Sequence, residues 1–87
     1  MAQLEGRVAV VTGAGDGIGA AIARRYVAEG ARVVIAELDE TRGRAVADEL
    51  DDRAVFVATD AGDKDQVEAA VAAAVTAFGG LDILVNN

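Results

Sequence analysis

A glycine-dense stretch, Thr12 to Gly19, has the residue types and spacing to bind a phosphate group. It follows the apolar run Val8 to Val11 and precedes a segment with helical spacing. The first turn of a helix has backbone N–H groups without intrahelical partners and a partial positive charge. Glycines let a ligand approach that backbone closely. A strand, a glycine turn and a helix in this order predict a dinucleotide-binding site.

An acidic residue lies at the distance from this turn expected for a ligand of a ribose. Glu37 ends the second apolar run, about 20 residues after the glycines. A glycine turn alone is a weak signal, but a strand, a turn, a helix and an acid at this spacing together favour a dinucleotide. The glycines fit two registers, Gly15-x-Gly17-x-x-Ala20 and the more specific Thr12-Gly13-x-x-x-Gly17-Ile18-Gly19.

Four short apolar runs alternate with three segments of helical spacing, and these elements must position the turn and the acid. This β-α-β-α-β-α-β order predicts parallel βαβ units with right-handed crossovers. We expect half of a Rossmann-type, doubly wound parallel α/β sheet with strand order 3-2-1-4, two helices on one face and one helix on the other. The strands are expected at 7–12, 32–36, 54–58 and 83–85, and the helices at 20–29, from a cap at Asp39 to Leu50, and from a capping box of Asp63 and Gln66 to Phe78.

The spacing of apolar residues predicts which side of each helix packs on the sheet. Tyr26 falls on such a stripe in the first helix, so we interpret it as a packing residue. The predicted inner faces are Ile18, Ala21, Ile22 and Tyr26 in the first helix, Gly43, Val46, Ala47 and Leu50 in the second, and Val67, Ala70, Val71, Ala74, Val75 and Phe78 in the third.

Composition narrows the possible partners. The 87 residues carry a formal net charge of −7, the opposite of what a nucleic-acid backbone or an anionic membrane would attract. No apolar run approaches the roughly 20 residues of a membrane span, and we see no signal peptide. The chain has no Cys and no His, which fits the cytoplasm and leaves no thiolate or imidazole metal site. The acidic run at 48–52 could conceivably hold a metal, but a solvated helix end is favoured.

The sequence resembles the short-chain dehydrogenase/reductase family. The matching features are the second glycine register, the strand at 33–37 with its terminal acid, Asp60 after the third strand, and the segment at 81–87 ending in Asn86-Asn87. The resemblance implies that the glycine turn lies against a cofactor diphosphate, Glu37 against the adenosine ribose and Asp60 against the adenine. The two asparagines would lie beside the ribose and hold the fourth strand. The candidate cofactor-binding residues are Gly13, Gly15, Asp16, Gly17, Ile18, Gly19, Glu37, Leu38, Asp60, Ala61 and Asn87.

Charge around the expected ribose site favours NAD over NADP. Glu37 can accept hydrogen bonds from a ribose diol but would repel the 2′-phosphate of NADP. Asp16 is acidic where NADP-preferring relatives commonly place a basic residue, and Leu38 supplies no charge.

The residues that would do hydride chemistry in this family are not found in these 87 residues. The family's catalytic Ser, Tyr and Lys lie further along its chains, whereas the single Tyr26 has Gly30 four places on and the single Lys is Lys64. We therefore expect residues 1–87 to be a dinucleotide-binding segment truncated before the catalytic part. The alternatives are a non-catalytic nucleotide-binding half-fold, a ligand-free scaffold, or an S-adenosylmethionine site, which the Thr12-Gly13 opening disfavours. A half-fold would also self-associate through the exposed edge of the fourth strand.

Overall fold

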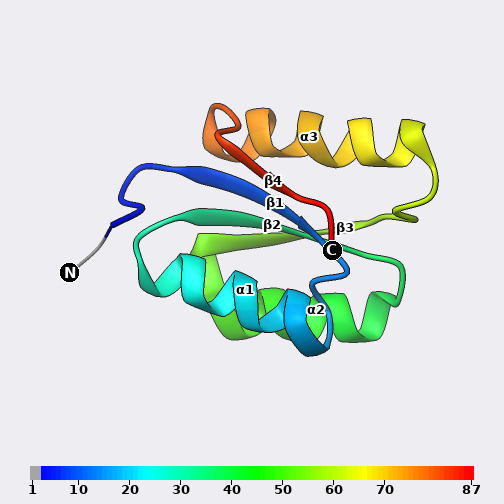
Figure 1. The fold of residues 1–87 in the computed structure, drawn as a ribbon, viewed down its shortest axis with the longest axis horizontal. Coiled ribbons are helices and arrows are strands. Elements are labelled where there is room, and N and C mark those ends of the chain that lie inside the picture. Colours follow the sequence, from blue (N-terminus) through cyan, green and yellow to red (C-terminus); the bar gives the residue numbers. More distant parts are fainter. Residues whose placement is uncertain (1–2) are drawn as a thin grey trace.

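The computed structural model describes residues 3–87, which form one four-stranded parallel sheet with helices on both faces (Figure 1). The strand order is β3-β2-β1-β4, which confirms the predicted half of a doubly wound α/β fold. The elements along the chain are β1 (Val8–Thr12), α1 (Gly17–Ala28), β2 (Arg32–Glu37), α2 (Glu40–Leu50), a 3-10 turn η1 (Asp51–Arg53), β3 (Ala54–Ala58), α3 (Lys64–Phe78) and β4 (Ile83–Val85).

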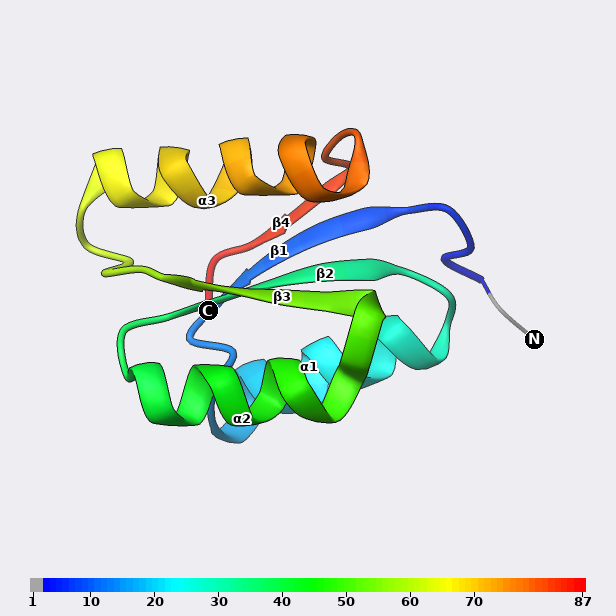
Figure 2. The same cartoon turned by 180° about the vertical axis from the view of Figure 1, so that it is seen from behind.

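Helices α1 and α2 cover one face of the sheet and α3 covers the other, as the two views in Figures 1 and 2 show. Each face has its own apolar core because successive strand residues point to opposite sides. In β1, Ala9 and Val11 belong to the core beneath α1 and α2, whereas Val8 and Val10 belong to the core beneath α3. Within residues 3–87, no helix is both long and apolar enough to cross a membrane.

The face that α1 turns to the sheet differs from the predicted one. Ile18 was expected on the inner stripe but is 72% exposed, and Ala21 is exposed as well. The buried residues of α1 are instead small ones and a single valine: Gly19, Ala20, Ala23 and Val27. Close packing of Gly19 on the glycine turn fixes the rotation of the helix, and small side chains allow that approach. Tyr26 packs against the core as predicted.

The predicted inner faces of α2 and α3 are largely confirmed. In α2, Gly43, Val46 and Ala47 are buried, and Ala70 and Ala74 are buried in α3. Val75 is the exception, because it is 53% exposed on the solvent side of its helix.

Aspartates begin all three helices by accepting backbone N–H groups of the first turn. Asp39 accepts from Arg42 N and Asp63 accepts from the N–H of Gln66, both as predicted. The Gln66 side chain was expected to bond back to the backbone N–H of Asp63, which would complete a capping box. Its Oε1 instead accepts the N–H of Asp60 at 2.8 Å, so this glutamine ties the loop after β3 to α3.

A second tie joins the two helices that share a face. The Arg24 guanidinium of α1 bonds to Glu49 of α2 at 2.8 Å and lowers the pKa of that carboxyl. Both side chains are exposed, so the pair orients α1 and α2 relative to each other more than it stabilises them.

Candidate functional site

The predicted site residues meet at the carboxyl edge of the sheet. Gly13 directly follows β1, Glu37 ends β2, and Asn87 follows β4 by two residues. Strand β1 lies between β2 and β4, and the crossover through α1 to β2 and the crossover through α3 to β4 lie on opposite faces of the sheet (Figure 1). Such a point in an open parallel sheet is where ligands bind. In Figure 1 the loop from β1 to α1 passes beside the end of the chain marked C.

Glycine is needed at two positions of the turn for two different structural reasons. A Cβ on Gly19 would overlap the carbonyl oxygen of Gly13 and lie 2.8 Å from Nδ2 of Asn87. Gly17 has φ +55°, and a Cβ placed there would meet nothing within 4 Å. Gly19 is therefore needed for packing, whereas Gly17 is needed for its backbone conformation. The open space over Gly17, at the start of α1, leaves room for a ligand to approach the helix N-terminus.

Glu37 is bonded to the glycine turn itself. Its Oε1 accepts the backbone N–H of Gly15 at 2.9 Å, and its Oε2 accepts the N–H of Asp39 at 2.9 Å. A carboxylate has about four lone-pair sites, so two remain for the hydroxyls of a ribose. A Cβ on Gly15 would lie 2.7 Å from Cγ of Glu37, so glycine is required for this approach.

Asp16 caps α1 and also contacts a residue that the sequence analysis missed. Its Oδ1 accepts the N–H of Gly17 at 2.8 Å, and its Oδ2 pairs with Nη1 of Arg42 at 3.1 Å. Arg42 Nε also lies 3.7 Å from Asp39. The position of Arg42 could be read from the sequence, because it follows the expected cap Asp39 by three residues and so lies in the first turn of α2, but its pairing with Asp16 could not.

Thr12 joins the ends of β1 and β4. It is fully buried, and its Oγ1 accepts the backbone N–H of Asn87 at 2.9 Å and lies 3.3 Å from both the carbonyl oxygen of Val85 and Oδ1 of Asn86. The side chain of Asn87 reaches over the turn, with Nδ2 beside Gly13. These bonds hold the two asparagines at the switch point.

Asp60 and Ala61 lie in the exposed loop that follows β3. Oδ1 of Asp60 accepts the N–H of Gly62 at 2.9 Å, which is the hydrogen bond of an Asx turn. The N–H of Thr59 bonds to the carbonyl oxygen of Glu37, so this loop begins beside the end of β2. The local bond accounts for an aspartate at this position without a ligand.

Two large apolar side chains at this edge face solvent. Ile18 is 72% and Leu38 is 70% exposed, and both are flanked by the polar residues already described. Neither contributes to the core, which fits side chains that lie against a flat ligand.

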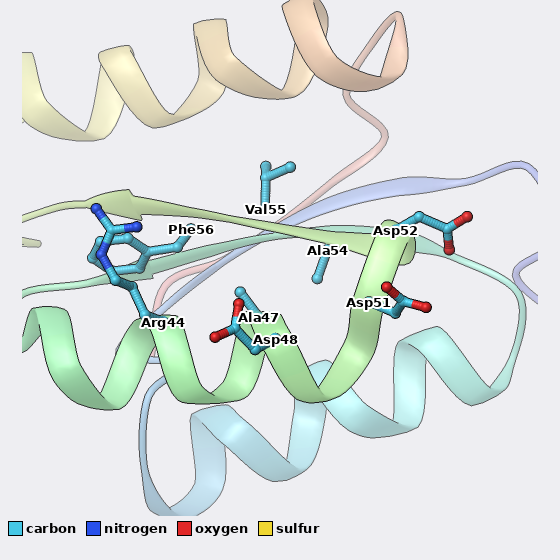
Figure 3. Close-up of a pocket in the computed structure, with 8 residues that line it drawn as sticks. All are labelled: Arg44, Ala47, Asp48, Asp51, Asp52, Ala54, Val55 and Phe56. Carbon is cyan, nitrogen blue, oxygen red and sulfur yellow. The ribbon is translucent and has the colours of Figure 1, made fainter.

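A hollow on the described surface lies away from this edge. It has a volume of about 410 Å³ and runs along the edge strand β3 and the second half of α2 (Figure 3). The Arg44 guanidinium lies 5.2 Å from the centre of the Phe56 ring on one side, and Asp48, Asp51 and Asp52 lie on the other. None of the predicted cofactor-binding residues lines this hollow, so it is not the predicted site. Within residues 3–87, no three acidic side chains are grouped to hold a metal ion.

The parallel sheet with a glycine turn, an acid at the end of β2 and a switch point beside β1 defines a Rossmann-type α/β protein. A family model for the short chain dehydrogenases matches residues 7–87, and the chain belongs to that family.

Relatives match along nearly the whole chain. An uncharacterized oxidoreductase of Thermotoga maritima is 49% identical over 88 residues, covering 98% of this chain and 34% of that protein. A 3-alpha-(or 20-beta)-hydroxysteroid dehydrogenase of Mycobacterium bovis is 51% identical, with 98% and 33% covered. The structure of a 3-ketoacyl-(acyl-carrier-protein) reductase from Brucella melitensis, complexed with NADH, superposes with a TM-score of 0.90 at 46% identity, covering 94% of this chain and 34% of that one. The chain thus spans about a third of the length of these relatives.

Proposed function

We propose that this chain is the cofactor-binding part of a short-chain alcohol or ketone oxidoreductase and that it binds NAD in preference to NADP. The observation that carries the proposal is the Glu37 carboxylate, which is fixed against the glycine turn by the N–H of Gly15 and keeps acceptor sites for a ribose diol. The nicotinamide would supply hydride transfer between a hydroxyl and a carbonyl in the complete protein. The residues of this chain would bind and orient the adenosine and diphosphate. A cytoplasmic location is part of the same proposal.

Three groups would hold the cofactor in this proposal. The turn from Gly13 to Gly19 and the first turn of α1 would face the diphosphate, where backbone N–H groups favour negative charge. Glu37 would accept from the ribose, with Leu38 beside it. Asp60, Ala61 and Asn87 would border the adenosine. The relative solved with NADH, which aligns over 94% of this chain, supports this arrangement.

The charges beside Glu37 support NAD. Asp16, Glu37 and Asp39 are three carboxylates, and Arg42 is the guanidinium among them. A 2′-phosphate would therefore enter a region of net negative charge, whereas the 2′-hydroxyl of NAD would meet an acceptor.

Titration of the 87-residue chain with NAD and NADP, followed by calorimetry, tests the proposal. We expect saturable binding of NAD and weaker binding of NADP. Equal or tighter binding of NADP would overturn the cofactor preference. Absence of saturable binding of either nucleotide would overturn the binding role and leave a ligand-free scaffold.

We also propose that the chain self-associates through the open edge of β4. Ile83 to Val85 pair with β1 on one side, and Leu84 is 48% exposed. An unpaired strand edge with apolar side chains promotes association. Sedimentation at increasing concentration should show species heavier than the monomer, and Leu84→Lys should shift the distribution toward the monomer. A monodisperse monomer of the unaltered chain would contradict this.

A further inference from the structure

Arg42, on α2, lies close to the carboxylate of Glu37. The Cβ of Arg42 and the carboxylate of Glu37 both lie over Gly15. A Cβ built on Gly15 would lie 3.0 Å from the Cβ of Arg42 and 2.8 Å from Oε1 of Glu37. Whatever Glu37 binds therefore lies within reach of a guanidinium on α2. This inference rests on the proposed function, because it takes the ribose to lie at Glu37.

Arg42 is held by contacts that are easily exchanged. Its partners are Asp16 on the glycine turn, at 3.1 Å, and Asp39 at the start of α2, at 3.7 Å. All three side chains are largely exposed, at 61%, 70% and 48%, so water and salt screen these pairs. A guanidinium has five N–H donors in a planar fork that matches a phosphate, and the pairs of Arg42 with Asp16 and Asp39 engage its Nη1 and Nε.

We propose that Arg42 is a specificity-determining residue: a latent ligand for a 2′-phosphate on the adenosine ribose, kept from that role by Asp16, Asp39 and Glu37. In the unaltered chain Asp16 and Asp39 pair with the guanidinium, and Glu37 repels a 2′-phosphate, so the chain selects the 2′-hydroxyl. Removal of Glu37 leaves an arginine already placed beside the ribose. The chain then needs no introduced basic residue to accept a 2′-phosphate.

Adenosine 2′,5′-bisphosphate and 5′-AMP test this, because they differ only in the 2′-phosphate. In a Glu37→Ser chain we expect the bisphosphate to bind at least about tenfold more tightly than in the unaltered chain. Adding Arg42→Gln should remove about tenfold of that affinity while 5′-AMP changes by less than about twofold. Adding Asp16→Asn instead should tighten the bisphosphate further, because Arg42 loses a competing partner.

Arg44→Gln in the same background is the matched control. Arg44 lies on the same helix, but its guanidinium pairs with Glu40 and lies 5.2 Å from the centre of the Phe56 ring (Figure 3), whereas Arg42 pairs with Asp16 of the glycine turn. Arg44→Gln should leave the bisphosphate affinity unchanged. An equal loss of affinity in the Arg42→Gln and Arg44→Gln variants would show a nonspecific effect of net charge and overturn the proposal. Unchanged bisphosphate affinity in Glu37→Ser/Arg42→Gln would overturn it as well.

The outcomes separate this inference from the proposed function. If the unaltered chain binds NAD, but adding Arg42→Gln to Glu37→Ser does not change the affinity for the bisphosphate, only the role proposed for Arg42 is wrong. If no chain binds any of the nucleotides, both fail. Should the Glu37→Ser chain not fold by circular dichroism, Glu37→Gln takes its place, with and without Arg42→Gln, because it removes the charge of the carboxylate and keeps its size; the same roughly tenfold loss of bisphosphate affinity is expected.

Discussion

Substitution of Gly19 by alanine is expected to destabilise the fold by about 3 kcal/mol or more, at the upper end of the cost of overpacking. The added Cβ would overlap the carbonyl oxygen of Gly13, which is backbone and cannot move aside as a flexible side chain would. It would also crowd Nδ2 of Asn87. For a chain of this size the midpoint of thermal unfolding should fall by roughly 12 °C or more. Circular dichroism during heating measures it.

Two further glycines separate a steric cause from a conformational one. Gly17→Ala meets no atom within 4 Å but keeps φ +55°, so it should cost about 1–2 kcal/mol. Gly80→Ala meets no atom and has no such φ, so its effect should stay within about 0.5 kcal/mol. Gly19 has no positive φ, so a loss in Gly19→Ala no larger than that in Gly80→Ala would show that the contact with Gly13 does not make glycine necessary at position 19.

Glu37→Ala combined with Leu38→Arg is expected to change the ratio of NAD to NADP affinity by about 100-fold in favour of NADP. Loss of the carboxylate removes charge-assisted hydrogen bonds to the ribose diol, each about 1.5–3 kcal/mol. It also removes the charge that repels a 2′-phosphate, and the arginine adds an attractive one. Leu38 is exposed, so arginine fits there without disturbing the core. Parallel calorimetric titrations with both cofactors give the ratio.

A variant with the same change in net charge on the other face of the sheet controls for nonspecific attraction. Glu68→Ala/Ala69→Arg alters two exposed positions of α3 and should leave the ratio within about twofold of the unaltered chain. A ratio that does not move in the Glu37 variant would show that the ribose does not lie at the end of β2.

The sequence was sufficient to predict the elements where local patterns dominate. The strands at 54–58 and 83–85 have the predicted bounds, and the predicted aspartate caps begin α2 and α3. Buried parallel strands read as continuous apolar runs, and caps are signalled by a short polar side chain before a helical pattern. The strand order 3-2-1-4 followed from the β-α alternation and the resemblance together.

The features that were not predicted from the sequence depend on contacts between segments far apart in the chain. The inner face of α1 was predicted only in part: Ile22 and Tyr26 pack against the core, but close packing of Gly19 on the Gly13 carbonyl leaves Ile18 exposed. Arg42 was missed because its partner Asp16 lies 26 positions away, and surface ion pairs leave no periodic pattern. Gln66 was placed in a capping box, but its carbonyl bonds to the loop after β3. The cofactor roles of Glu37, Asp60 and Asn87 stay predictions.

The attachment of β4 to β1 has a consequence for synthesis of the chain. Both ends of β1 are tied to residues 82–87: Asp82 accepts the N–H of Val8, and Asn87 bonds to Thr12, 75 positions away. Of the four strands described, β1 is made before the others and receives its second neighbour, β4, only after β2 and β3 have been made. Contacts of such long sequence separation slow folding, and an unpaired strand edge in a folding intermediate is prone to aggregation. A nascent chain carrying only β1, β2 and β3 would expose as its edge β1, a strand whose five residues are all buried once β4 has paired with it.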